Sequence, residues 1–166
     1  MAETLTLTAT SKEEIYQEIY PQIEGILGGE TDLVANMANL SAVLMAAFHH
    51  LWIGFYLVRQ YEGKEQLVLG PFQGPLACTR IAYGRGVCGT AWKNAETLVV
   101  PDVDQFPGHI ACSSLSRSEI VVPIFYGQQS EGKVAAVLDI DSTETETFDE
   151  IDRVWLEKIV KLICIE

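Results

Sequence analysis

Four cysteines are the residues of this chain with the widest chemical repertoire. Cys88 follows a glycine-rich run, Cys112 lies in an irregular polar loop, and Cys78 falls in a predicted strand. A thiol in a loop or near a helix start can be exposed, and backbone N–H groups can stabilise its thiolate. Cys164 follows the apolar pattern of a C-terminal helix and is predicted to pack there. The candidates for nucleophilic or redox chemistry are therefore Cys78, Cys88 and Cys112.

The same thiols allow two interpretations without catalysis. Cysteines in cytosolic domains are commonly small buried hydrophobic residues. A zinc site is the second alternative, with Cys78, Cys88, Cys112 and His109 as ligands. None of these cysteines forms the close C-x-x-C pair that is usual in structural zinc sites, so we expect no metal.

Three carboxylates form the second chemical group. Glu119 begins an otherwise apolar strand, and Asp139 and Asp141 interrupt the apolar segment 137–142. Alternation along a strand places Asp139 and Asp141 on the same face. Such a cluster can bind a substrate ammonium group, or it can donate a hydrogen bond if like-charge repulsion keeps one member protonated. Metal coordination and a solvated strand end remain alternatives.

The glycine-rich segment 84–89 does not predict nucleotide binding. It lacks both the Gly-Lys-Ser/Thr ending of a P-loop and the G-x-G-x-x-G spacing of a dinucleotide site. The three histidines are scattered and form no evident catalytic pair.

Helices at both ends of the chain are predicted to bracket the strands that hold these residues. The spacing of Ser11 and Glu14 is that of a capping box before an apolar helical pattern, in which Pro21 marks a kink or break. A second helix is capped by Thr31 or Asp32. A closing helix follows a capping-box spacing at 147–150, with an apolar face made of Ile151, Val154, Trp155, Ile159, Leu162 and Ile163.

Short apolar runs between these helices predict an extensive sheet. A hairpin is expected over 52–69, with a short helix after Gly86. The segment 101–118 has no clear periodicity and is the natural place for a functional loop. Further strands are predicted at 77–82, 97–100, 119–125 and 133–140.

Composition limits the possible classes of protein. With 166 residues, 48% of them hydrophobic, the chain is expected to form one domain over 1–166, with a flexible segment at 1–10. A net charge of -12 disfavours nucleic acids and anionic membranes as partners. No secretory signal or membrane-spanning segment is evident, so we expect a cytoplasmic protein whose thiols are mostly reduced.

Several segments, which together hold two of the three candidate thiols, Cys88 and Cys112, and all three carboxylates, resemble the free methionine-(R)-sulfoxide reductases, a family of GAF-like domains. The resemblance spans nearly the whole chain, with the motifs in the same order. The segments are 52–56 (WIGFY), 69–74 (LGPFQG), 84–91 (GRGVCGTA), 109–112 (HIAC), 118–121 (SEIV) and 138–142 (LDIDS).

The resemblance implies an α+β, GAF-like fold. Its central antiparallel sheet would carry helices on one face and a loop-covered pocket on the other, and two copies would form a homodimer. A GAF-type small-molecule sensor without catalysis is the alternative function. A sensor, however, has little need for three placed thiols.

The resemblance also implies a catalytic cycle without a metal or organic cofactor. The Cys112 thiolate would attack the sulfur of free methionine-(R)-sulfoxide, releasing methionine and leaving a sulfenic acid. Cys78 would resolve it as a disulfide, with Cys88 as an alternative or relay, and a thioredoxin-type dithiol would reduce that disulfide. This cycle would serve the cell under oxidative stress.

The remaining roles fall on the carboxylates and two aromatic residues. Asp141 is the expected proton donor, because the sulfoxide oxygen must leave as water. Glu119, Asp139 and Asp141 would hold the amino group. Trp52 and Tyr56 would enclose the methyl end of the substrate.

Overall fold

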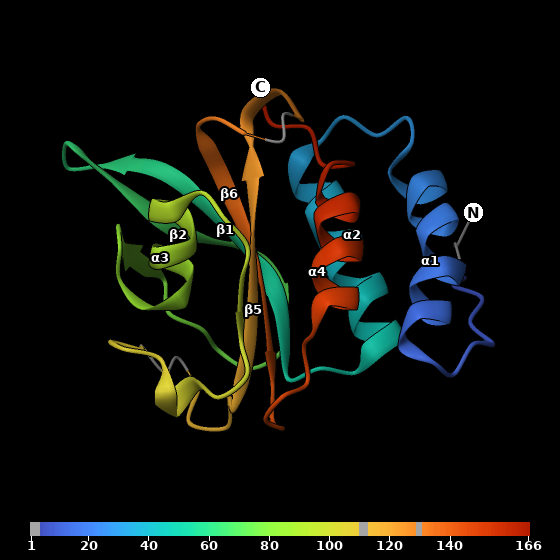
Figure 1. Ribbon diagram of the computed structural model, residues 1–166. Coiled ribbons are helices and arrows are strands. Elements are labelled where there is room, and N and C mark those ends of the chain that lie inside the picture. Colours follow the sequence, from blue (N-terminus) through green and yellow to red (C-terminus); the bar gives the residue numbers. More distant parts are fainter. Residues whose placement is uncertain (1–3, 110–112, 129–130) are drawn as a thin grey trace.

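The computed structural model describes residues 4–109, 113–128 and 131–166. Its centre is an antiparallel sheet of six strands in the order β3-β2-β1-β6-β5-β4 (Figure 1). The expected antiparallel sheet is therefore confirmed. In chain order the strands are β1 (Trp52–Tyr61), β2 (Lys64–Gln73), β3 (Arg80–Ala82), β4 (Leu98–Val100), β5 (Ser118–Phe125) and β6 (Val134–Ser142).

Helices α2 (Leu33–Phe48) and α4 (Glu150–Val160) lie against one face of the sheet, and α1 (Lys12–Leu27) packs on these two helices from the outside (Figure 1). Their apolar faces pack with alternate residues of β1, β5 and β6 in the larger hydrophobic core. The predicted helices at both ends of the chain are thus confirmed. Two of their details differ: α1 continues through Pro21 without a break, and the Ser11 hydroxyl bonds the Glu14 carboxylate instead of capping the helix. Asp32 caps α2 as expected, by accepting a hydrogen bond from the Ala35 N–H.

The other face of the sheet carries the short helix α3 (Gly86–Asn94) and the loop that contains the 3-10 turn η1 (Val103–Gln105). A second, smaller core lies between them and the sheet, with α3 contributing Val87, Ala91 and Trp92. This face holds the polar residues predicted to do chemistry. The long segment 101–118 is largely irregular in its described part, as the sequence indicates.

The C-terminal helix differs from its predicted bounds. Its capping box uses Asp149 and Asp152: the Asp149 side chain accepts from the N–H groups of Ile151 and Asp152, and the Asp152 side chain accepts from the Asp149 N–H. The helix ends at Val160, so Cys164 lies beyond it and is exposed. The prediction that Cys164 packs on a helix is therefore wrong. Val154, also predicted on the apolar face, is 55% exposed.

The N-terminal residues lie along α1. Backbone N–H groups of Thr8 and Ala9 donate to the Glu18 carboxylate, and Gln22 bonds both the N–H and the C=O of Thr6. These bonds hold the first described segment against the helix.

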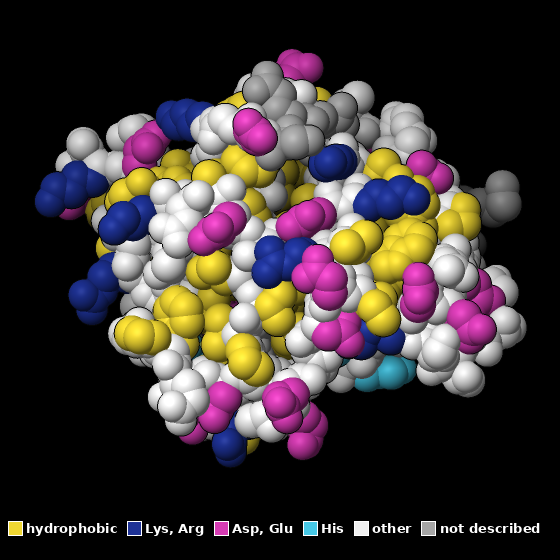
Figure 2. All heavy atoms as spheres, viewed as in Figure 1, with side chains coloured by type: hydrophobic (Ala, Val, Ile, Leu, Met, Phe, Trp, Pro, Cys, Tyr) yellow, Lys and Arg dark blue, Asp and Glu magenta, His cyan; other side chains and the backbone are white. Residues whose placement is uncertain are grey.

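None of the described helices combines the length and the apolar content that crossing a membrane requires. On the face seen in Figure 2, basic side chains lie scattered among acidic and apolar ones.

Candidate active site

A pocket lies between α3, the irregular loop and the pocket face of the central strands. The sheet supplies the three predicted carboxylates and both predicted aromatic residues, while α3 supplies Cys88. The structure thus gathers six of the eight predicted site residues around one cavity. They are Trp52, Tyr56, Cys88, Glu119, Asp139 and Asp141.

Strand register explains why the carboxylates meet. Glu119 of β5 pairs directly with Asp141 of β6, and Asp139 lies two residues along β6 on the same face. Glu119 and Asp139 are each 6% exposed, and Asp141 is partly exposed. The prediction that Asp139 and Asp141 share one face is confirmed.

Burial and mutual repulsion keep protons in this cluster. Loss of hydration raises the pKa of Glu119 and of Asp139 well above the usual range, and the nearby charge of Asp141 raises both further. Burial also raises the pKa of Asp141 to about 6, although the Ser116 hydrogen bond and the His109 charge lower it. Because the three groups interact, they share protons as a set. The site can therefore offer an acidic proton near neutral pH.

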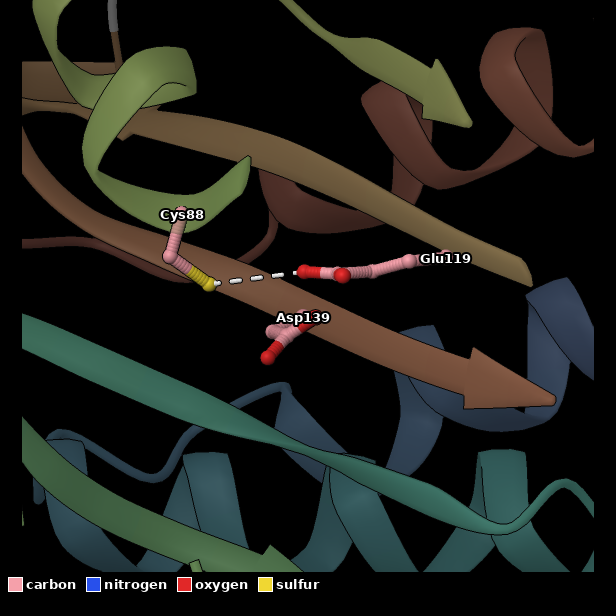
Figure 3. A group of neighbouring side chains, drawn as sticks. All are labelled: Cys88, Glu119 and Asp139. Carbon is pink, nitrogen blue, oxygen red and sulfur yellow. Dashed lines mark hydrogen bonds between the residues drawn. The ribbon is translucent and has the colours of Figure 1, made fainter. Parts of the chain in front are cut away.

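Cys88 lies in the first turn of α3 and points toward the carboxylates (Figure 3). Its thiol donates a long, weak hydrogen bond to Glu119 Oε1, with Sγ and Oε1 4.0 Å apart. Burial raises the pKa of this thiol, and the charges of Asp139 and Glu119 raise it further. Cys88 is therefore held as a thiol, which disfavours it as the first nucleophile.

Two glycines allow α3 to present Cys88 in this way. Gly86 begins the helix with a φ of 61°, in the left-handed region that favours glycine. A Cβ on Gly89 would lie 2.6 Å from the carbonyl oxygen of Ala82 in β3, so the helix approaches the sheet edge more closely than any side chain permits. The glycine-rich segment therefore serves close packing.

Stacked aromatic side chains, called the aromatic wall below, line the pocket at β1. The Trp52 ring stacks with Tyr56 and Phe72 at centroid distances of 5.8 and 5.2 Å. Gly54 lies between Trp52 and Tyr56 on the same strand face, and a Cβ there would lie 2.6 Å from the Trp52 ring. The glycine in the WIGFY segment thus lets the indole lie along the strand.

The other cysteines differ in their settings. Cys78 is partly buried in an irregular segment before β3 rather than in the predicted strand, and it is disulfide-bonded. The Tyr56 hydroxyl donates to the Cys78 carbonyl oxygen over 3.0 Å. Cys112, the predicted nucleophile, lies outside the described residues. Its role and that of Cys78 stay predictions.

The structure adds two polar residues to the predicted site. Ser116 is 7% exposed and donates a short hydrogen bond to Asp141 Oδ1. His109 Nε2 lies 3.5 Å from Glu119 Oε2. Each residue orients one carboxylate from the loop side. Sequence reasoning had weighed His109 only as a zinc ligand, and nothing in the serine-rich stretch before β5 distinguishes Ser116 from its neighbours.

The arrangement combines a proton source, an apolar aromatic surface and a free thiol in one pocket. Buried carboxyl groups with raised pKa can donate a proton to a polar oxygen or bind an ammonium group once ionised. The aromatic wall suits a small apolar group. The site therefore suits a small molecule that has an amino group, an apolar end and an oxygen to be protonated.

Comparison with known proteins agrees with this geometry. The model of the GAF domain family matches residues 23–166. The chain is 55% identical over 163 residues to GAF domain-containing protein A of Dictyostelium discoideum, which covers 98% of this chain and 99% of that protein. It is 44% identical over 158 residues to the free methionine-R-sulfoxide reductase of Saccharomyces cerevisiae, covering 92% and 86% of the two chains.

A solved structure gives the same result. The free methionine-R-sulfoxide reductase of Neisseria meningitidis, determined in complex with its substrate, superposes with a TM-score of 0.91 at 53% identity. The match covers 96% of this chain and 92% of that one. The fold, the order of the motifs and these relatives agree, and the chain belongs to the GAF domain family, among the free methionine-R-sulfoxide reductases.

Proposed function

We propose that this protein reduces free methionine-(R)-sulfoxide to methionine. The observation that carries the proposal is the pocket itself, where protonated carboxyl groups meet an aromatic wall. The yeast relative and the Neisseria structure bear the name of this activity, and the latter was determined with its substrate bound.

The proposed reaction begins at Cys112, whose thiolate attacks the sulfoxide sulfur. The oxygen passes to the cysteine, so that methionine leaves and Cys112 becomes a sulfenic acid. The Cys78 thiol then attacks this sulfenic acid, forming a disulfide and releasing water. Exchange with a thioredoxin-type dithiol restores both thiols and oxidises the reductant. Cys88 acts as an alternative or relay thiol.

Asp141 is the proposed proton donor to the sulfoxide oxygen. Its pKa of about 6 leaves it protonated in a useful fraction of molecules near neutral pH. The Ser116 hydroxyl bonds one of its oxygens, which leaves the other for the substrate. Glu119 and Asp139 bind the ammonium group, whose charge offsets the repulsion among the carboxylates.

The wider setting of the enzyme belongs to the same proposal. A homodimer and recycling by a thioredoxin-type reductant are inferred from the family resemblance, and a cytoplasmic location is inferred from the sequence, in which no secretory signal is evident. The acidic net charge of -12 supports small-molecule chemistry over nucleic-acid binding.

Single-turnover assays on cysteine variants test the order of the chemistry. We expect Cys112→Ser to release no methionine, because a hydroxyl is a far poorer nucleophile toward sulfur than a thiolate. Cys78→Ser should release about one methionine per chain and then stop as the sulfenic acid. The exposed Cys164 provides the matched control, and Cys164→Ser should cycle like the wild type. A full first turnover by Cys112→Ser would move the nucleophile elsewhere, and unimpaired cycling by Cys78→Ser would give the resolving role to Cys88.

Substrate preference tests the role of the carboxylates. Initial rates should be much higher on free methionine-(R)-sulfoxide than on its N-acetylated amide, because blocking the amine removes the charge that the buried carboxylates require. The free S sulfoxide should also react poorly, since one proton donor and one aromatic wall accept a single configuration. Equal rates on the blocked compound would contradict ammonium binding, and equal rates on both epimers would contradict the proposed pocket.

A further inference from the structure

We propose that the reduced, substrate-free pocket is a binding site for a divalent zinc-like cation, held by Cys88, Glu119 and Asp139. One donor atom from each residue lies within 4.8 Å of the other two, and all three side chains are buried. They come from three elements, α3, β5 and β6, and their functional groups point toward one another (Figure 3). This set differs from the zinc ligands considered from the sequence, with which it shares only Cys88.

The spacing of the donor atoms suits a single ion. In a tetrahedral zinc site, metal–sulfur and metal–oxygen distances of about 2.3 and 2.1 Å place sulfur and oxygen about 3.6 Å apart. Cys88 Sγ and Glu119 Oε1 are 4.0 Å apart, so small side-chain rotations bring both atoms onto one ion. Three protein ligands leave the fourth position to water, as in zinc sites with an open position.

One buried oxygen of this cluster has no hydrogen-bond partner among the described residues. Asp139 is 6% exposed, and its Oδ1 makes no hydrogen bond with any residue in the described ranges. An isolated buried acceptor of this kind is costly unless a ligand satisfies it. Because Asp139 lines the pocket, a cation there would supply the missing partner.

The surroundings prepare Glu119 for coordination. Its Oε1 faces Cys88, whereas its Oε2 lies 3.5 Å from His109 Nε2. A neighbouring side chain that holds one carboxylate oxygen orients the other toward the metal. A bound divalent cation would also neutralise the repulsion among three crowded acidic groups.

The ligand set selects the class of metal. Thiolate is a soft ligand that favours zinc and its neighbours, whereas Mg²⁺ and Ca²⁺ require oxygen ligands. Zinc binds the thiolate form of Cys88, so the protein must release protons as the ion binds. Oxidation of Cys88 would remove the sulfur ligand, so the site requires Cys88 as a free thiol, which is its state here beside a disulfide-bonded Cys78.

The consequence for activity rests on the proposed function, although the binding itself does not. Glu119 and Asp139 are the proposed ligands for the substrate ammonium group. The cation and the substrate would therefore compete for the same carboxylates, and zinc would act as a competitive inhibitor. The site would link reductase activity to the concentration of free zinc.

Direct binding without substrate tests the proposal. Metal-free protein is first reduced with a phosphine that does not chelate zinc. Zinc affinity is then measured by titration with zinc chloride in competition with a chromophoric chelator. In a separate titration, Co²⁺ binding is followed by its absorption spectrum. We expect one ion per chain, proton release, and a sulfur-to-cobalt charge-transfer band. Magnesium chloride should not compete. A cobalt complex without the sulfur band would overturn the proposal.

Variants assign the ligands. Cys88→Ser should abolish the charge-transfer band, and Asp139→Asn should also weaken zinc binding. We expect each variant to lose more than about 100-fold in zinc affinity, because changing residues that only support the ligands already lowers metal affinity about 10- to 100-fold. Cys164→Ser, a change at an exposed cysteine, should bind like the wild type. Unchanged affinity in Cys88→Ser, or loss of binding in Cys78→Ser or Cys112→Ser alone, would place the metal on other thiols and overturn the assignment. These measurements need no turnover, so they can fail while the reductase activity holds, and the reverse.

Discussion

Three carboxyl groups share one buried pocket, and their protons connect stability with catalysis at the scale of single residues. Burial raises the pKa of Asp141 from 3.8 to about 6, so the folded chain keeps a proton that the unfolded chain releases between these values. The stability that this proton contributes is present at low pH and is lost as the pH rises through about 6. Glu119 and Asp139 shift in the same direction. At alkaline pH the protein therefore holds buried charges that oppose folding.

Replacing Asp141 by asparagine separates the two effects. At pH 8 we expect Asp141→Asn to raise the free energy of unfolding by about 1 to 3 kcal/mol, since a shift of one pKa unit corresponds to about 1.4 kcal/mol and coupling reduces the gain. The gain should vanish below about pH 4. The same variant should reduce sulfoxide in a single turnover about 100- to 10,000-fold more slowly, because it has no acidic proton to give.

Urea unfolding at several pH values and rapid-quench assays measure these outcomes. Asp104→Asn is the matched control, because Asp104 is an exposed aspartate on the neighbouring turn η1. It should change neither quantity. An Asp141→Asn variant that keeps the wild-type single-turnover rate would move the proton-donor role to Glu119 or Asp139.

At the scale of elements, the position of α3 against β3 decides where Cys88 lies. The backbone of Gly89 approaches the Ala82 carbonyl too closely for a Cβ atom, and Gly84 N–H donates to the Gly89 carbonyl over 3.0 Å. Helix and sheet edge are therefore in direct backbone contact. Any residue larger than glycine at 89 must displace the first turn of α3, and the neighbouring Cys88 with it, from its present position.

Gly89→Ala should therefore lower the free energy of unfolding by about 1 to 3 kcal/mol, as overpacked sites do. We also expect weaker zinc binding, because the displaced Cys88 thiol no longer converges with Glu119 and Asp139. Gly25→Ala is a matched control in α1, where a Cβ meets nothing within 4 Å. It should stabilise the protein by about 0.5 to 1 kcal/mol, because alanine favours a helix more than glycine does. A Gly89→Ala protein as stable as the wild type would show that α3 adjusts without cost.

In the whole molecule, the sheet separates two hydrophobic cores, one that mainly stabilises the fold and one that surrounds the pocket. The larger core lies under α1, α2 and α4 and contains most of the buried apolar residues, whereas the smaller one surrounds the pocket. A polar network joins the first and last helices on the larger side. Asp152 is 1% exposed and accepts hydrogen bonds from the Tyr16 hydroxyl and the Lys12 ammonium group. This network ties the two ends of the chain together away from the chemistry.

Removing the buried carboxylate should cost stability without altering the pocket. We expect Asp152→Ala to lower the free energy of unfolding by about 3 to 5 kcal/mol, as breaking a buried ion pair does. At a temperature where it stays folded, the variant should still release about one methionine per chain in the single-turnover assay, at the wild-type rate. Lys133→Ala, which breaks the exposed pair with Glu65, is the comparison and should cost less than about 1 kcal/mol. Equal losses in urea unfolding would contradict the structural role of the network.

Sequence patterns were sufficient to predict the helices at the two ends, the hairpin, the sheet strands and the shared face of Asp139 and Asp141. These features follow from local periodicity, which depends only on neighbours along the chain. The order of the family-like motifs also identified six residues that the fold brings to one pocket. Local patterns were enough for the five of these residues that lie on β1, β5 and β6, because alternation along the chain defines those strands.

The remaining features depend on how the folded chain packs. The end of α4 before Cys164, the irregular path at Cys78 and the capping by Asp149 depend on packing and hydrogen bonds that apolar spacing does not record. The contacts of Ser116 and His109 with the carboxylates likewise join residues distant in the chain. Raised pKa values and the convergence of Cys88 with two carboxylates arise from burial shared by separate elements. Burial is a property of the assembled fold, so no local segment contains it.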